Sequence, residues 1–190
     1  SLVNSTWKVR ICNNAILRGT TYGTVEGDVV LHSGDNLLTA MTNATAGQVL
    51  LLDGNVVFPI GGSAYNFSKN IKIRSTSPTN RSIICMTAGT PTTTANMFGV
   101  VAGSAIDSLV FENIEFTGYC DNNSSATKIG YLFNNKTACS ISALKMLNCK
   151  IHNLGNTPFR LSGNTGTTAA TSQRISNLII NGCIINETGF

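Results

Sequence analysis

A sequence repeat with a period near 35 residues constrains the fold of this 190-residue chain more than any other feature. Three segments share alternating apolar residues, then one Asn or Gly, then alternating apolar residues again: 109–118, 144–153 and 178–187. They begin 35 and 34 positions apart, and each follows a short aromatic segment, at 97–101, 131–133 and 159–161. Self-similarity at a fixed period indicates stacked structural units.

The units have the pattern of strands. Ankyrin and tetratricopeptide repeats have a similar period but need two helices per unit, whereas these segments alternate at every second residue. Charged residues are only 12% of the chain, about half of the usual share, which disfavours helical bundles. The sequence therefore predicts an all-β fold, a right-handed single-stranded parallel β-helix. Each unit would form one rung of three short strands, stacked ~4.8 Å from the rung before.

Stacking places equivalent positions of successive rungs in columns. Four inner columns are predicted: Leu109 with Leu144 and Leu178, Phe111 with Met146 and Ile180, Ile114 with Cys149 and Cys183, and Phe116 with Ile151 and Ile185. The single Asn or Gly, at positions 113, 148 and 182, falls at a corner where a left-handed backbone favours these residue types. We expect the Asn side chains to form a hydrogen-bonded ladder along the axis.

Charged residues fall on the outward rows of the same segments. Arg74 and Glu112 are predicted to be neighbours in adjacent rungs, and so are Glu115 and Lys150. Pairs of this kind contribute a few tenths to about 1 kcal/mol and help to hold the register.

The part of the chain before the repeat begins differently. Residues 35–45 have helical periodicity, with Asp35 as the expected N-cap, and this helix would cap the coil. Residues 53–55 (Asp-Gly-Asn) between two apolar runs are a usual hairpin signal, although the later repeat favours a corner there. Residues 70–74 and 83–85 resemble an earlier copy of the repeat, split by a loop at 75–82.

These boundaries predict the domain organisation. Residues 1–34 are expected to be an irregular or linker region or the first strands, with a candidate strand at 7–12. Residues 35–190 form the β-helix, with its helical cap at 35–45 and rungs from 48 onward. The last recognisable rung lacks a capping helix, which leaves two alternatives: a fragment of a longer chain, or a homo-oligomer joined end to end through this uncapped C-terminal rung.

Charge and hydropathy exclude two classes of partner. The net charge is +4, but no two Lys or Arg residues are adjacent, so we expect no nucleic acid partner. A mildly basic surface still suits an acidic polymer such as a uronic-acid glycan. No apolar segment approaches the ~20 residues that span a bilayer, so the chain is not expected to be transmembrane.

The six cysteines do not form a metal motif. No Cys-x-x-Cys spacing occurs and only two His are present, so neither a metal site nor a cofactor is expected. Cys149 and Cys183 should touch across adjacent rungs. They would pack as thiols that behave as small hydrophobes, or they would form a disulfide between rungs.

A family resemblance adds to this pattern. Residues 36–40 (NLLTA), 45–55 (TAGQVLLLDGN) and 70–74 (NIKIR) resemble the N-terminal entry of pectate-lyase-like (pectin lyase-like) β-helix proteins, with Gln48 where Asp is usual. Over residues 36–190 the chain is most similar to alginate-lyase and chondroitinase-B-like chains and to β-helix domains of gut-bacterial surface lipoproteins. The resemblance implies a bacterial solenoid-repeat protein that is secreted or on the cell surface, hence extracellular or at the outer cell surface.

The same resemblance defines candidate site residues. Polysaccharide lyases of this superfamily need a base, commonly Lys or Arg, and a group that neutralises the uronate. The catalytic candidates are Lys150, His152 and Arg160, and the candidate ligand-binding residues are Glu115, Tyr119, Tyr131 and Lys145. The alternatives are that Lys150 simply pairs with Glu115, that His152 is solvated, and that the Tyr side chains pack in the core or at its rim instead of stacking on sugar rings.

Three functions follow, and the sequence does not identify a particular glycan. The favoured one is a secreted or cell-surface module that binds polysaccharide without catalysis (carbohydrate binding alone). The alternatives are a polysaccharide lyase acting on uronic-acid glycans, with Lys150 or Arg160 as its base, and a structural or adhesive β-solenoid.

Overall fold

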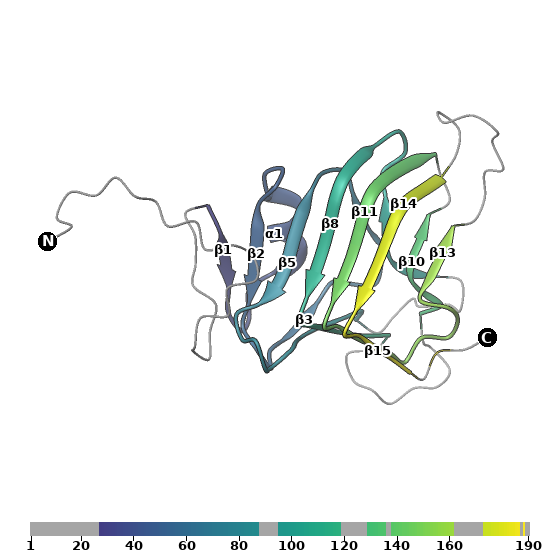
Figure 1. The fold of residues 1–190 in the computed structure, drawn as a ribbon. Helices are drawn as coiled ribbons and strands as arrows, with labels where there is room; N and C mark the ends of the chain where they lie inside the picture. The colour runs from purple at the N-terminus through teal and green to yellow at the C-terminus, as the bar shows by residue number, and fades with distance from the viewer. Residues whose placement is uncertain are drawn as a thin grey trace, which may run out of the picture.

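The described strands form three sheets in which every pair of neighbouring strands is parallel (Figure 1). The structure is a computed structural model, and it describes residues 27–87, 95–118, 129–135, 138–161, 173–186 and 188. Sheet A contains β1 (Val29–Leu31), β2 (Val49–Leu52), β5 (Ile71–Ser75), β8 (Ala105–Glu112), β11 (Cys139–Leu147) and β14 (Gln173–Asn181). Sheet B contains β3 (Val57–Pro59), β6 (Ser82–Cys85), β9 (Ile114–Thr117), β12 (Lys150–His152) and β15 (Ile184–Ile185). Sheet C contains β4 (Tyr65–Phe67), β7 (Asn96–Val100), β10 (Tyr131–Asn135) and β13 (Phe159–Leu161).

From β2 onward the chain visits sheets A, B and C in rotation, and we call one such pass a rung. The predicted all-β class is confirmed, since the described part is three parallel sheets with a single helix. The hairpin alternative for residues 53–55 is wrong, because β2 and β3 lie in different sheets. Those residues form a corner instead, and Asn55 has a φ of 61°.

The strand register confirms the predicted columns. Leu144 pairs with both Leu109 and Leu178, and Ile151 pairs with Phe116 and Ile185. The predicted corner is also present: φ is 57° at Asn113, 51° at Asn148 and 65° at Gly182.

The amide ladder at this corner is confirmed as well. The Nδ2 of Asn148 donates to the Oδ1 of Asn113 at 2.7 Å, across adjacent rungs. The Nδ2 of Asn113 continues the ladder by donating to the backbone oxygen of Ser77. Residue types that tolerate a left-handed backbone thus also supply the hydrogen bonds between rungs.

Strands of sheet A begin earlier than predicted. The repeat was recognised from Leu109 and Leu144, but β8 begins at Ala105 and β11 at Cys139. Ile106 and Ile141 are also buried, but two residues, in place of the usual one, separate each of them from the next inner Leu. This extra residue breaks the alternation, so the upstream half does not have the pattern of a regular strand.

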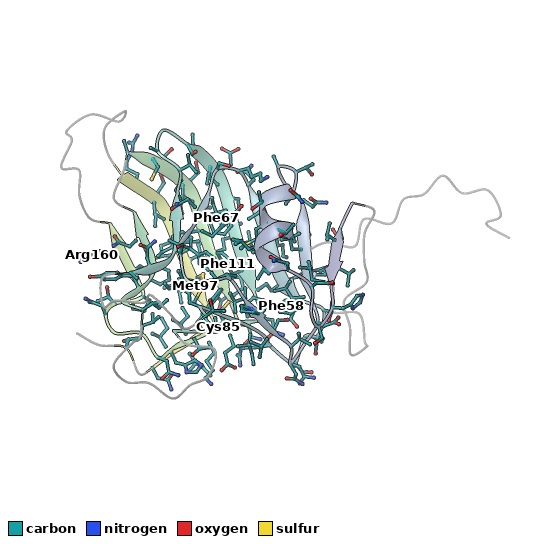
Figure 2. The ribbon with its side chains drawn as sticks, turned by 180° about the vertical axis from the view of Figure 1, so that it is seen from behind. Phe58, Phe67, Cys85, Met97, Phe111 and Arg160 are labelled. Carbon is teal, nitrogen blue, oxygen red and sulfur yellow. The ribbon has the colours of Figure 1, made fainter. Side chains whose placement is uncertain are left out.

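Phenylalanine rings from all three sheets meet in the space between the sheets. Phe111 of sheet A lies 5.5 Å from Phe98 of sheet C and 5.4 Å from Phe116 of sheet B, between ring centroids. Phe67 and Phe133 extend the same cluster. Figure 2 shows Phe67 and Phe111 between the sheets. Aromatic pairs contribute about 0.5–1.5 kcal/mol each beyond their burial, so this cluster holds the sheets together.

The helix α1 (Leu37–Asn43) buries Leu37 and Met41 in the core. Its N-cap is Asn36, whose side chain accepts from the backbone N–H of Thr39 at 2.9 Å, so the prediction of Asp35 was wrong. The carboxylate of Asp35, the residue before the N-cap, instead accepts a hydrogen bond from the backbone N–H of His32 at 2.7 Å. No helix in the described residues is long and apolar enough to cross a membrane.

The last described rung is open to solvent. Leu178 and Ile180 of β14 are 44% and 43% exposed, whereas their column neighbours Leu144 and Met146 are fully buried. The prediction that Leu178 lies inside was therefore right in register and wrong in burial. The reason is that β14 is the edge strand of sheet A, with no described strand beyond it.

Candidate functional site

The candidate residues are distributed over three sheets. Glu115, Lys150 and His152 are on sheet B, Lys145 is on sheet A, and Tyr131 and Arg160 are on sheet C. Tyr119 and the candidate strand at 7–12 lie outside the described residues. The structure brings the candidates together in two groups. Tyr131 and Arg160 meet on sheet C, and the three residues on sheet B form what we call the Glu115 cluster.

The Glu115 cluster is built on one carboxylate oxygen. The Oε1 of Glu115 lies 3.0 Å from the Nζ of Lys150 and 2.8 Å from the Nε2 of His152. Register places Lys150 directly beside Glu115 on the neighbouring strand, and His152 is two residues further along. The predicted pair of Glu115 with Lys150 is thus confirmed, and His152 joins it because alternate residues of β12 share a face.

Hydrogen bonds, acting against burial, set the charge state of Glu115. Burial alone raises the pKa of Glu115, but hydrogen bonds from Lys150 and His152 outweigh it and lower that pKa below the ordinary value. The Glu115 carboxylate is therefore held in its charged form.

His152 is not solvated, so that alternative was wrong. It is 7% exposed, and its row neighbours Thr117 and Cys85 are also buried. Alternation places all three on the outward side of sheet B, so that part of the outer face is covered. Cys85 is disulfide-bonded.

This arrangement limits what Lys150 can do chemically. A general base must accept a proton from the substrate, and geometry comes first in recognising one. The Nζ of Lys150 instead donates to Glu115, and His152 shares that acceptor under the covered part of the face. The donors of Lys150 and His152 are thus directed at the protein's own carboxylate and not toward a substrate.

Arg160 belongs to a second group, on sheet C. Its guanidinium lies 5.2 Å from the centroid of the Tyr131 ring, and its Nη1 donates to the Tyr131 hydroxyl. Asn156 donates to the same hydroxyl at 2.9 Å. Tyr131 is 2% exposed, so its ring packs within the protein and positions the exposed Arg160 by a cation–π contact.

Sheet A carries further charges on its outer face. Arg74 and Glu112 are neighbours in register, as predicted. Lys72 also forms an ion pair with Glu112, and its Nζ lies 2.5 Å from the Oε2 of Glu112. Diagonal neighbours on adjacent strands are within reach of long side chains, so Lys72 reaches Glu112 from two residues away in register. Lys145 lies in the same row as Lys72, two rungs further along.

Sequence reasoning missed Arg81. Its Nε and Nη2 donate to the backbone oxygen and the Oδ1 of Asn148, at 2.8 and 2.9 Å. Arg81 thereby fastens a corner that is 67 residues away in sequence. It lies in the loop between β5 and β6, which has no counterpart in the other units, so the repeat carried no signal for it.

Among the described residues, no group of three or more His, Cys, Asp or Glu side chains is arranged to hold a metal ion. Comparison of the chain with protein-family models finds no matching family, and comparison with curated proteins finds no match.

Proposed function

We propose that the chain folds as a right-handed single-stranded parallel β-helix of the pectate-lyase-like type. The support is the rotation of the chain through three parallel sheets and the in-register columns that join successive rungs. A crystal structure in which the strands of one rung pair with one another, and not with the next rung, would contradict this.

We propose further that the protein is a secreted or cell-surface module that binds an acidic polysaccharide without cleaving it. The observation that carries this is the outer face of β11 and β14. Arg174 and Asn181 are exposed near the two ends of β14, and Lys145 lies between them on β11. Seven residues of strand span roughly 23 Å, which suits an extended polymer. The Arg side chain pairs with carboxylates, and the Asn side chain binds hydroxyl groups.

The Glu115 cluster supports binding over catalysis. Both of its donors are taken up by one carboxylate, and Arg160, the other candidate base, is held by Tyr131 on another sheet. Lyase activity would require Lys150 to leave Glu115 and reach a substrate.

Two double variants with the same charge change test where and whether glycan binds. Lys145→Ala with Arg174→Ala removes both cations from the outer face of sheet A. Lys150→Ala with Arg160→Ala removes both candidate bases from sheets B and C. Binding to alginate, pectate and chondroitin sulfate is measured by calorimetry at low and high salt, together with absorbance of unsaturated uronate products.

We expect the sheet A variant to bind roughly tenfold more weakly, since two exposed ion pairs contribute up to about 1 kcal/mol each. The matched variant should bind like the wild type. Absorbance from wild-type protein that the Lys150 and Arg160 variant lacks would establish the lyase. If the protein binds none of these glycans, a structural or adhesive solenoid is the function that remains.

The open rung supports a proposal about self-association. We propose that the apolar end formed by β14 and β15 contacts the same end of a second copy. At the opposite end of sheet A, Leu31 of β1 and Leu37 and Met41 of α1 are buried, so the more apolar surface is at the open end and we pair one open end with another. Such a contact is isologous and closes as a dimer.

A further inference from the structure

Two free thiols lie one above the other at the corner of the last two described rungs. Cys149 follows the left-handed residue Asn148, and Cys183 follows the left-handed residue Gly182. The Sγ of Cys183 accepts from the backbone N–H of Cys149 at 3.3 Å. Neighbouring strands are about 4.8 Å apart, which falls within the Cα separation that a disulfide requires.

The two thiols differ in access. Cys149 is fully buried, whereas Cys183 is half-buried on the open rung. In the monomer, where the open rung is uncovered, an oxidant therefore reaches Cys183 first. The strand that follows it, β15, is the edge strand of sheet B, with no described strand beyond it.

The surroundings favour a thiolate at Cys183. The hydrogen bond from Cys149 and, to a smaller extent, the positive charge of Arg81 lower the pKa of Cys183, while the same hydrogen bond raises the pKa of Cys149. Arg81 is held at this corner by its two hydrogen bonds to Asn148. A thiolate that is partly exposed and close to a guanidinium is the reactive form in thiol–disulfide exchange.

We propose that Cys149 and Cys183 form a reversible disulfide that fastens the open rung to the rung before it, by exchange with a low-molecular-weight disulfide. The Cys183 thiolate attacks one sulfur of that reagent, the S–S bond breaks, and the first thiolate leaves. The Cys149 thiol then attacks the Cys183 sulfur in the mixed disulfide, and its proton passes to the second thiolate, which leaves as a thiol. Two cysteine thiols are oxidised and one disulfide is reduced to two thiols.

The chain already contains a disulfide, at Cys85. Disulfides persist where the surroundings are oxidising. Conditions that maintain the disulfide at Cys85 therefore also favour a disulfide between Cys149 and Cys183. The new bond would close a loop of 34 residues, which restricts the unfolded chain and stabilises the open rung. This inference is independent of glycan binding.

Oxidation of the native full chain by oxidised glutathione, at a protein concentration low enough for the monomer, tests the proposal. Free thiols are alkylated after unfolding, and the cross-linked peptides are mapped by mass spectrometry. Wild type should lose two free thiols, yield a Cys149–Cys183 peptide, and unfold several degrees higher than the protein before oxidation, which keeps the disulfide at Cys85.

Three single variants separate the steps. Cys149→Ser should accumulate glutathione on Cys183, because the resolving thiol is missing. Cys183→Ser should leave Cys149 unmodified, because Cys149 is buried. Cys139→Ser, which removes another buried thiol at the start of β11, should behave like the wild type.

Wild-type protein that keeps both thiols free after exposure to oxidant would overturn the proposal. So would glutathione addition to Cys149 in the Cys183→Ser variant at the rate seen for Cys183. The wild-type peptide map decides the question even where a variant fails to fold.

Discussion

Glu115 accepts two hydrogen bonds on one oxygen, and the depressed pKa of its carboxyl couples the folded state to pH. A carboxyl with a lower pKa in the folded state contributes stability above its unfolded pKa. That contribution is lost as the pH falls through the folded pKa. The pH dependence of stability therefore reports on this side chain.

We expect Glu115→Gln to lower the free energy of unfolding by about 1 kcal/mol at pH 7, as for a half-buried ion pair. The difference should shrink as the pH falls below about 4.3 and through the folded pKa. Urea unfolding at pH 7, 5 and 3 measures it, with Asp107→Asn, an exposed carboxylate, as control. A difference between wild type and Glu115→Gln that stays constant over this range would contradict the assignment.

At this scale the sequence was informative about columns and weak about partners. The pair of Glu115 and Lys150 follows from register alone. The burial of His152 does not, because it depends on what covers the outer face of sheet B. The same holds for Tyr131. Its position in an aromatic strand can be predicted from the sequence, whereas its burial and its contact with Arg160 cannot.

The corner between sheets A and B is the element that most depends on residue type. Asn148 has a φ of 51°, donates to Asn113, and accepts two bonds from Arg81. Leu at this position would be strained by about 1–2 kcal/mol, and it would lose side-chain hydrogen bonds of about 1 kcal/mol each.

Asn148→Leu should therefore lower the free energy of unfolding by roughly 3–4 kcal/mol, whereas Lys145→Ala should change it by less than about 0.5 kcal/mol. Thermal and urea unfolding measure both. Asn148→Gly keeps the backbone conformation, as Gly182 does one rung later, and should lie between the two. Equal stability of the Asn148→Leu and Lys145→Ala variants would show that the corner assignment is wrong.

Elements were predicted well where the period was regular. The strands β9, β10, β12 and β13 fall where the repeat put them. The helix α1 was also recognised, although its N-cap was misplaced by one residue because Asp35 and Asn36 are both good caps. The upstream halves of β8 and β11 were missed because an extra residue interrupts their alternation.

For the whole molecule, the proposed end-to-end contact makes a prediction about mass in solution. Ile180 and Ile185 of the open rung are 43% and 41% exposed. If this end buries against a second copy, wild-type protein should sediment as a dimer at micromolar concentration, and Ile180→Lys with Ile185→Lys should sediment as a monomer.

Val57→Lys is the control for that measurement, because Val57 is an exposed apolar residue on β3, far from the open rung in chain order. It should leave the mass unchanged. A wild-type monomer at every concentration would contradict the dimer, and a dimer that survives both lysines would place the contact elsewhere.

The sequence alone determined the all-β class, the columns and the corners. These are local and periodic: alternation assigns a residue to the inside or the outside, and Asn or Gly marks a left-handed corner. Tertiary structure decided which charges meet and which side chains are covered. Lys72 reaches Glu112, and Arg81 reaches Asn148 from a loop that belongs to no repeat. Contacts of this kind depend on the length and direction of single side chains across rungs, and a period of 35 residues carries no information about them.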